Sequence, residues 1–183
     1  MEKIADFIYE AGMLKKLPRS GYAFLGGGQE SVAEHSFMIA TIAFALSRME
    51  SDVDGARLVA MCLLHDLPEA RIGDLNYVQK RYCDAQEAKA VAHQASGLPF
   101  GLEYKRLIEE FNEGKTPEAK LAKDADQLAF IHDLKKLMDT GHKGAEKWLD
   151  VVMGRLVTET GKHLAQAMVS RDWDAWWLDG YSE

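Results

Sequence analysis

The chain has 183 residues and carries 29 acidic against 22 basic side chains, so its formal net charge is −7. Its length fits a single domain, and 47% hydrophobic with 28% charged residues is typical of a globular protein and excludes a disordered chain. The acidic balance argues against a general nucleic-acid binder, because such proteins neutralise phosphates with basic side chains.

The chain opens with a predicted amphipathic helix that ends near Pro18. Its apolar side chains recur at the spacing of one helix face, at Ile4, Phe7, Ile8, Ala11 and Leu14. The segment 18–29 is a predicted loop, because it contains a proline and four glycines. Within this loop, the run Gly26–Gly28 predicts that this side of the pocket is mobile.

Two apolar helices are predicted next. The first covers 31–48, where Ser31 and Glu34 have the form of a capping box. The second covers 55–66 after Asp54 as the cap, and we expect its apolar stretch Leu58–Leu64 to be buried on all sides.

Shorter helices follow. Pro68 can stand in the first turn of a short helix that breaks near Gly73. Further helices are predicted over 84–96 and 101–112, each bounded by a glycine or a polar segment.

Thr116 as the cap and Pro117 at the first helical position start a long predicted helix, which runs to about Thr140. The segment 145–169 is also predicted to be helical, with an interruption near Gly161, and a short aromatic tail follows it. No segment shows the alternation of a strand. The predicted fold class is therefore all-α.

The cysteines and the apolar runs indicate where the protein acts. Cys62 and Cys83 are too few for a disulfide framework, which favours a reducing compartment. The N-terminal residues have no signal-peptide core, and the longest apolar run, Leu58–Leu64, is far shorter than a membrane span. We expect a cytoplasmic protein with no membrane partner.

Histidines and carboxylates in helical segments suggest a metal site. His65 and Asp66 are adjacent at the end of the most apolar helix, where both can reach one cation. His35 and Asp126 are polar residues inside otherwise apolar helices, and burying a charge is costly unless it is paired or bound to metal. Imidazole nitrogens and carboxylate oxygens suit a divalent transition metal.

The order of these residues resembles the HD-domain metal-dependent phosphohydrolases. Those proteins have a His, a His-Asp pair about thirty residues later, and an Asp within a later helix. Over about 13–137, four blocks of text narrow the resemblance to the 5′-deoxynucleotidase branch, namely Leu14–Tyr22, Glu30–Ser36, Leu64–Asp74 and Glu118–Leu128. The resemblance implies a single HD-domain helical bundle over 1–183, with a core motif region of about 13–140 and C-terminal helices of about 144–183 that complete the bundle.

The resemblance also implies a role for each site residue. The family's metal ligands fall on His35, His65, Asp66 and Asp126. Glu69 and Asp74 match acidic positions that the family uses in catalysis and, in some members, for a second metal ion. Arg19 lies where the family orients the substrate phosphate. Tyr22 stands where many relatives have a tryptophan, so it is the candidate for contact with the base or the sugar.

The residue types suit this chemistry on their own terms. Glu69 lies three and four residues after Asp66 and His65, so in a helical turn it shares their face and can accept a proton from water. Asp74 can protonate the departing 5′ oxygen or hold a second ion. The guanidinium of Arg19 is a planar fork that matches phosphate.

The implied function is removal of the 5′-phosphate from deoxynucleoside 5′-monophosphates, with a divalent ion (Mn, Co, Ni, Zn, Fe or Mg) as cofactor. The single loop base Arg19 favours a monophosphate over two alternatives in the same superfamily, a phosphodiesterase and a nucleoside triphosphohydrolase. Lower-ranked alternatives are a dinuclear-iron oxidoreductase, for which His93 would be the further ligand, and a non-catalytic metal-binding module. The expected partners are the substrate and a second copy of the chain in a homodimer, with no polymeric nucleic acid.

The other histidines and the tryptophans are predicted to be structural. His132 and Asp133 imitate the motif but have no partner block. His93, His142 and His163 are expected at the surface. The tryptophans are expected to be packing anchors or a subunit contact and not a base-stacking platform; they are Trp148, Trp173, Trp176 and Trp177.

Overall fold

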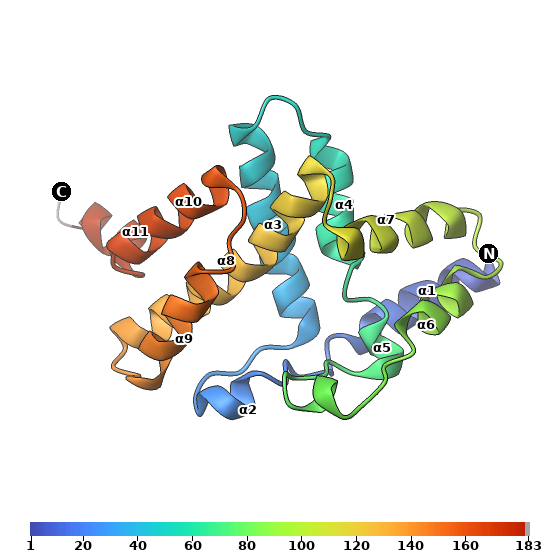
Figure 1. Cartoon of the computed structure of the whole chain (residues 1–183), viewed down its shortest axis with the longest axis horizontal. Coiled ribbons are helices and arrows are strands. Elements are labelled where there is room, and N and C mark those ends of the chain that lie inside the picture. Colours follow the sequence, from blue (N-terminus) through green and yellow to red (C-terminus); the bar gives the residue numbers. More distant parts are fainter. Residues whose placement is uncertain (182–183) are drawn as a thin grey trace.

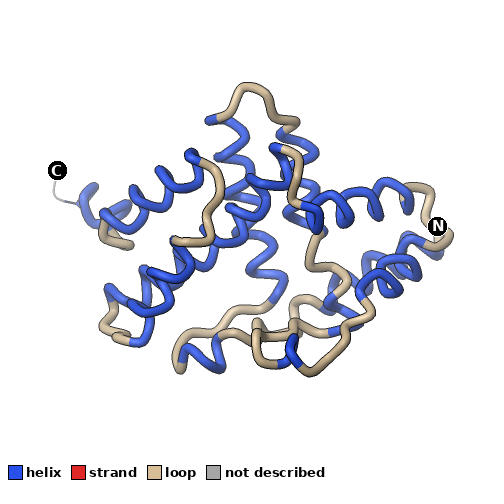
Figure 2. Tube along the Cα trace, viewed as in Figure 1, coloured by secondary structure: helices blue, strands red, loops and turns tan. Residues whose placement is uncertain are grey.

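The computed structural model describes residues 1–181. Its regular elements are helices, which confirms the predicted all-α class. Figure 2 shows helices joined by loops, and the described residues contain no strand beyond one isolated bridge between Pro18 and Ser31. None of the helices described is long and apolar enough to cross a membrane. The last two residues of the predicted domain, 182–183, lie outside the described part of the chain.

The helices follow one another with short connections. In chain order they are α1 (Glu2–Met13), α2 (Tyr22–Leu25), α3 (Val32–Met49), α4 (Gly55–Leu64), α5 (Glu69–Ile72), α6 (Glu87–Ala95), α7 (Gly101–Glu113), α8 (Pro117–Asp139), α9 (Gly144–Met153), α10 (Glu159–Ser170) and α11 (Ala175–Leu178), with short 3₁₀ turns at Gln79–Arg81 and Asp179–Tyr181.

Helices α3, α4 and α8 form the centre of the molecule (Figure 1) and pack against one another. On one side, α7 packs on α4 and α6, while α5 packs on α1 and α6. On the other side, α9 and α10 pack on α8. The two described ends of the chain therefore lie on opposite sides of the centre.

Two apolar cores hold these helices together. The larger core is built mainly from α3, α4, α8 and α9. The smaller core joins α1, α3, α6 and α7 to the turn after α4, through Leu14, Val32, Leu67, Val91, Tyr104 and Ile108. Leu64 packs against both cores. The segment that follows it, His65–Asp66, therefore lies where the two cores meet.

Three predicted helix starts are confirmed by the side chains that cap them. Ser31 accepts a hydrogen bond from Glu34 N, while the Glu34 carboxylate accepts one from Ser31 N, completing the capping box. Asp54 accepts from Arg57 N at the start of α4, and Thr116 accepts from Ala119 N at the start of α8. Local side-chain chemistry is enough to set these boundaries.

The predicted interruption of the last long helix is in the wrong place. The break falls between Met153 and Glu159, and Gly161 lies inside the first turn of α10. Buried Asp124 of α8 stabilises this break by accepting hydrogen bonds of 2.8 Å from both Val157 N and Thr158 N. A Cβ on Gly161 would collide with the Asp124 carboxylate, so the glycine provides space and does not end the helix.

Other sequence predictions differ from the structure in smaller ways. Leu63 is 50% exposed, so the stretch Leu58–Leu64 is not buried on all sides, and Ile8 on the predicted buried face of α1 is 63% exposed. Helix α4 ends at Leu64 because the next residues form a tighter turn, in which Leu67 N bonds Leu64 O. Helix α6 begins three residues late, at Glu87, and the loop 18–29 contains α2.

Candidate active site

His35 and Asp126 form the first pair of the site. His35 lies in the first turn of α3, 1% exposed, and Asp126 lies on the central helix α8. Their Nε2 and Oδ1 atoms are 2.8 Å apart. The other ring nitrogen, Nδ1, is 3.4 Å from Glu30 Oε2. The capping box sets where α3 starts, and His35 in its first turn is thereby placed against Asp126 of α8.

His65 and Asp66 form the second pair, directly after α4. His65 Nδ1 lies 2.9 Å from the Cys62 carbonyl oxygen, and its Nε2 lies 3.1 Å from Asp66 Oδ1. The imidazole stacks at a tilt on Phe111, with ring centroids 4.3 Å apart. The bond to Cys62 O and the contact with Phe111 orient the ring so that Nε2 faces the carboxylates.

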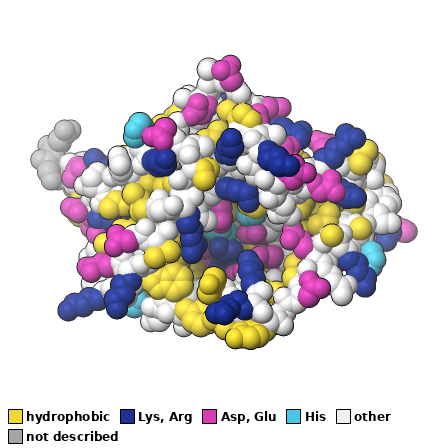
Figure 3. Space-filling view, viewed as in Figure 1, with side chains coloured by type: hydrophobic (Ala, Val, Ile, Leu, Met, Phe, Trp, Pro, Cys, Tyr) yellow, Lys and Arg dark blue, Asp and Glu magenta, His cyan; other side chains and the backbone are white. Residues whose placement is uncertain are grey.

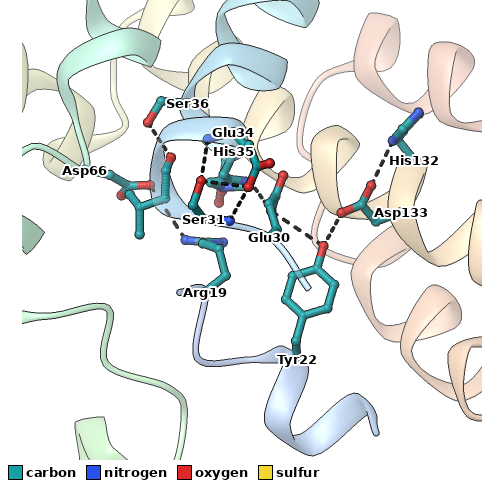
Figure 4. A network of polar contacts seen from close by, with 12 residues as sticks. Arg19, Tyr22, Glu30, Ser31, Glu34, His35, Ser36, Asp66, His132 and Asp133 are labelled. Atoms are coloured by element: carbon teal, nitrogen blue, oxygen red, sulfur yellow. Dashed lines mark hydrogen bonds and ion pairs between the residues drawn. The ribbon is translucent and has the colours of Figure 1, made fainter. Parts of the chain in front are cut away.

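Arg19 connects the second pair and Asp74 to the loop before α3. Its Nη1 lies 3.6 Å from Asp66 Oδ2 and 3.9 Å from Asp74 Oδ2 (Figure 4 shows the contact with Asp66). Asp74 also accepts a hydrogen bond of 2.7 Å from Ser20 N. A backbone hydrogen bond of 2.8 Å from Arg19 N to Glu30 O joins the two ends of this loop.

The charges of the cluster perturb one another strongly. Burial opposes the charge on Arg19, but Asp66, Asp126 and Asp74 together raise its pKa above the ordinary value. Burial also opposes charge on His35, yet its hydrogen bond to Asp126 and the nearby carboxylate of Glu30 raise its pKa to about 9. The pKa of Asp126 is lowered despite burial, mainly by the hydrogen bond from His35.

Glu69 is the most unusual carboxylate of the site. It stands at the start of α5, and its Oε2 atom is buried with no hydrogen-bond partner. Burial raises its pKa to about 9, and the nearby charges of Asp66 and Asp74 act in the same direction. At such a pKa the carboxyl group holds its proton at neutral pH, and a cation bound beside it would favour the ionised form that can accept a proton.

Tyr22 is held rigidly at the edge of the site. Its hydroxyl donates to Asp133, and it lies 3.5 Å from Glu30 Oε2; Asp133 in turn contacts His132 (Figure 4). Burial, followed by the bond to Asp133, raises the pKa of this phenol. His132 and Asp133 thus position Tyr22, a role that the sequence analysis did not assign to them.

The glycine run supports this tyrosine. Gly28 has a φ of +76°, and a Cβ there would approach the Tyr22 ring to 3.0 Å. The sequence predicts that the run Gly26–Gly28 makes this side of the pocket mobile, and at Gly28 the close approach of the Tyr22 ring adds a steric reason for glycine.

A cavity of about 450 Å³ opens beside the cluster. Figure 3 shows a hollow near the middle of this face of the molecule, with acidic and histidine side chains inside and Lys and Arg around it. Arg19, Tyr22, Asp74 and Asp126 line the cavity together with side chains that the sequence analysis did not select, namely Asn76, Tyr77, Lys80, Gln127, Phe130, Trp148 and Arg155. A second cavity, of about 180 Å³, is lined by His65, Asp66 and Glu69. Lys80 lines both.

The predicted site residues thus come together from four separate blocks of the sequence. The signal for the missed ones was weak: Gln127 adjoins Asp126, and Phe130 follows it by one helical turn, but nothing marked Trp148 or Arg155. Two of the remaining histidines, His93 and His163, are exposed and lie apart from the cluster. His142 is half-buried and lies 2.9 Å from Leu25 O, so it packs against α2.

The donor set fits a divalent metal ion. Two imidazoles and two carboxylates are the ligand types that such ions prefer. Asp66 Oδ2 is buried with no hydrogen-bond partner, so one ligand atom is left available. Four carboxylates, those of Asp66, Glu69, Asp74 and Asp126, surround the single guanidinium of Arg19. Within residues 1–181, however, no three such side chains are already grouped at metal-binding spacing, because they stand as two pairs.

Comparison with known proteins extends over most of the chain. The model of the HD domain matches residues 11–168. The 5′-deoxynucleotidase HDDC2 of Danio rerio is 33% identical over 137 residues, which cover 72% of this chain and 68% of that protein. The protein of the same name from Homo sapiens is 29% identical over 146 residues, covering 76% and 71%.

Solved structures agree in fold. A conserved hypothetical protein from Pyrococcus furiosus superposes with a TM-score of 0.78 at 29% identity, covering 91% of this chain and 99% of that one. A protein described as a predicted metal-dependent phosphohydrolase from Magnetospirillum magnetotacticum gives a TM-score of 0.73 at 26% identity, covering 92% and 90%.

Proposed function

Because this chain belongs to the HD domain family, we propose that it is a metal-dependent phosphohydrolase that removes the 5′-phosphate from deoxynucleoside 5′-monophosphates. The observation that carries the proposal is the cavity of about 450 Å³, whose lining combines the charged side chains of Arg19, Asp74 and Asp126 with several aromatic side chains. Such a cavity suits a ligand with an anionic end and a planar apolar end.

We assign the metal to His35, His65, Asp66 and Asp126. When bound, a divalent ion would activate water as a nucleophile and neutralise phosphoryl oxygens. Arg19 then supplies the protein's own contact to the phosphate, since its planar guanidinium can donate two parallel hydrogen bonds to two phosphate oxygens. Asp66 and Asp74 hold this guanidinium at 3.6 and 3.9 Å and so fix its position.

We assign proton transfer to Glu69 and Asp74. Glu69 Oε2 is buried beside Asp66 with no hydrogen-bond partner; a divalent ion bound at the neighbouring ligands would favour its ionised form, which can accept a proton from the attacking water. Asp74 lines the larger cavity and is the candidate to protonate the departing 5′ oxygen. A second ion held by Glu69 and Asp74 is the competing role, and counting metal equivalents in Glu69→Gln separates the two.

The test is a phosphate-release panel. Purified protein is stripped with a chelator and reloaded in turn with Mn, Co, Ni, Zn, Fe or Mg. It is then given deoxynucleoside and ribonucleoside monophosphates, the triphosphates and a cyclic dinucleotide. We expect metal-dependent release from the deoxynucleoside monophosphates and little turnover of the others. Efficient triphosphate or diester cleavage without monophosphate hydrolysis would overturn the proposal.

We also propose a homodimer formed by an apolar patch on α3 and α4. Phe37, Phe44 and Leu63 are 68%, 56% and 50% exposed and border one shallow depression with Ala33, Ala40 and Thr41. Exposed apolar side chains gathered in this way are typical of an interface. The exposed Trp176 and Trp177 of α11 are the alternative surface.

We further propose one HD domain over the chain and a cytoplasmic location. The domain proposal rests on the way α9 and α10 pack on α8 and complete the larger core. The location rests on the two cysteines, since Cys62 and Cys83 are both free.

A further inference from the structure

The larger cavity has an aromatic corner on α8 and α9. Phe130 and Trp148 meet edge to face, with ring centroids 5.8 Å apart and planes at 88°. Tyr22 also packs edge to face against Phe130, with ring centroids 6.2 Å apart. Both corner side chains are half-buried and line the cavity. Trp148 therefore does more than anchor α9 in the core, because part of its ring remains available to a ligand.

The corner lies at a suitable distance from the phosphate end of the site. Phe130 follows Asp126 by four residues on α8, so both side chains project from one face of the helix about 6 Å apart along its axis. Gln127 lies between them in sequence and donates from Nε2 to Asp126 Oδ2 at 2.8 Å. This spacing leaves room for a sugar ring between a phosphate near Asp126 and a flat group at the corner.

Arg155 supplies the polar complement. It is exposed just after α9 and lines the same cavity as Trp148. A guanidinium offers only donors, and every nucleobase presents carbonyl or ring-nitrogen acceptors at its edge. An aromatic surface likewise accepts any base, because each has a π-face.

From these contacts, and resting on the proposed function, we propose that Phe130 and Trp148 form the nucleobase subsite of this enzyme and that Arg155 meets the edge of the bound base. The subsite accepts all four bases. It contributes affinity for the nucleoside part of the substrate and takes no part in the transfer of the phosphoryl group.

The first experiment compares a substrate that has a base with one that lacks it. In Trp148→Ala, kcat/KM for dAMP should fall about 5- to 150-fold, the range that the loss of one base–aromatic stack gives. For 2-deoxyribose 5-phosphate it should change less than about 2-fold. Arg155→Ala should act in the same direction with a smaller effect. Trp176→Ala and Arg106→Ala, both at exposed positions, serve as matched controls. An equal loss with both substrates would overturn the proposal.

The second experiment does not depend on turnover. Metal-free protein is titrated with deoxyadenosine while tryptophan fluorescence is followed, and Trp148→Phe should abolish most of the quenching that Trp176→Phe leaves intact. Trp148→Phe also keeps an aromatic ring if the alanine variant does not fold, and it should retain most activity toward dAMP. Absence of quenching in the natural sequence would overturn the subsite. Failure of phosphate release alone would overturn only the proposed function.

Discussion

At the scale of single residues, Asp124 and Asp126 lie two positions apart on α8 and contact different groups. Asp126 pairs with His35 and lines the larger cavity, whereas Asp124 is fully buried and bonds to the backbone before α10. Residues two positions apart on an α-helix are rotated by more than half a turn about its axis. The two carboxylates therefore face different sides of α8.

We therefore expect opposite effects from two alanine substitutions. Asp126→Ala should remove bound metal and activity while the fold persists. Asp124→Ala should keep its metal in the folded protein but lower the free energy of unfolding by about 2–4 kcal/mol, because it leaves hydrogen-bond donors unpaired. Metal content by mass spectrometry and thermal unfolding measure both effects. Full metal content in Asp126→Ala would show that the ligand assignment is wrong.

Glu69 allows a second prediction at this scale. Glu69→Gln keeps the shape of the side chain but cannot accept a proton, so kcat should fall about 10²–10⁴-fold at unchanged fold. Glu87 lines the same smaller cavity and bonds Asn112, so Glu87→Gln is the matched control and should stay near normal. A near-normal kcat in Glu69→Gln would refute the role.

At the scale of the helices, a polar network joins the N-terminal helix to the turn that carries the motif. Glu10 of α1 accepts hydrogen bonds of 2.8 Å from Arg71 Nη2 and from Gln94 Nε2 of α6. Gln94 Nε2 also donates to Leu67 O, and Tyr104 of α7 donates to Gln94 Oε1. Four elements thus meet around one amide next to His65–Asp66.

This network predicts a pH-dependent contribution to stability. The hydrogen bond from Arg71 lowers the pKa of Glu10 below its ordinary value of 4.5. The contribution is therefore complete above pH 4.5 and is lost as the pH falls through the lower pKa of the folded state. Glu10→Gln should reduce Tm at pH 7, and the difference from the natural sequence should shrink below about pH 4.5. Glu109, exposed and paired with Lys105 on α7, provides the control Glu109→Gln. A difference in Tm that is independent of pH would contradict this prediction.

The sequence predicted helices well where the determinants are local. Three helix starts could be predicted because each cap side chain accepts a hydrogen bond from a backbone N–H only three residues later. These caps are Ser31, Asp54 and Thr116. The break between α9 and α10 was misplaced because its determinant, Asp124, lies more than thirty residues earlier in the chain. The charged residues of the site formed an ordered motif, but Trp148 and Arg155 did not. They reach the cavity only because α9 folds back on α8, and no short-range pattern encodes that contact.

At the scale of the whole molecule, the apolar patch on α3 and α4 leads to a prediction about assembly. Sedimentation at micromolar concentration should give twice the mass of the chain. Phe44→Glu places a charge in the patch and should shift the protein toward monomer, while Ile8→Glu, on exposed α1 surface, should not. A strict monomer would contradict the homodimer, and a dimer disrupted by Trp176→Glu instead would move the interface to α11.

The two cores that meet at Leu64 also have a consequence for how the molecule comes apart. Regions with separate cores often behave as separate cooperative units, so the smaller core can open while the larger one stays folded. Because His65 and Asp66 lie between the two cores, this opening would disturb the site. In native-state hydrogen exchange, amides of α1 and α6 should exchange faster than those of α3 and α8. Catalysis should then cease in mild denaturant while most of the helical circular dichroism signal persists. Inactivation would precede global unfolding, and the time for which the enzyme stays active would depend on the stability of the smaller core.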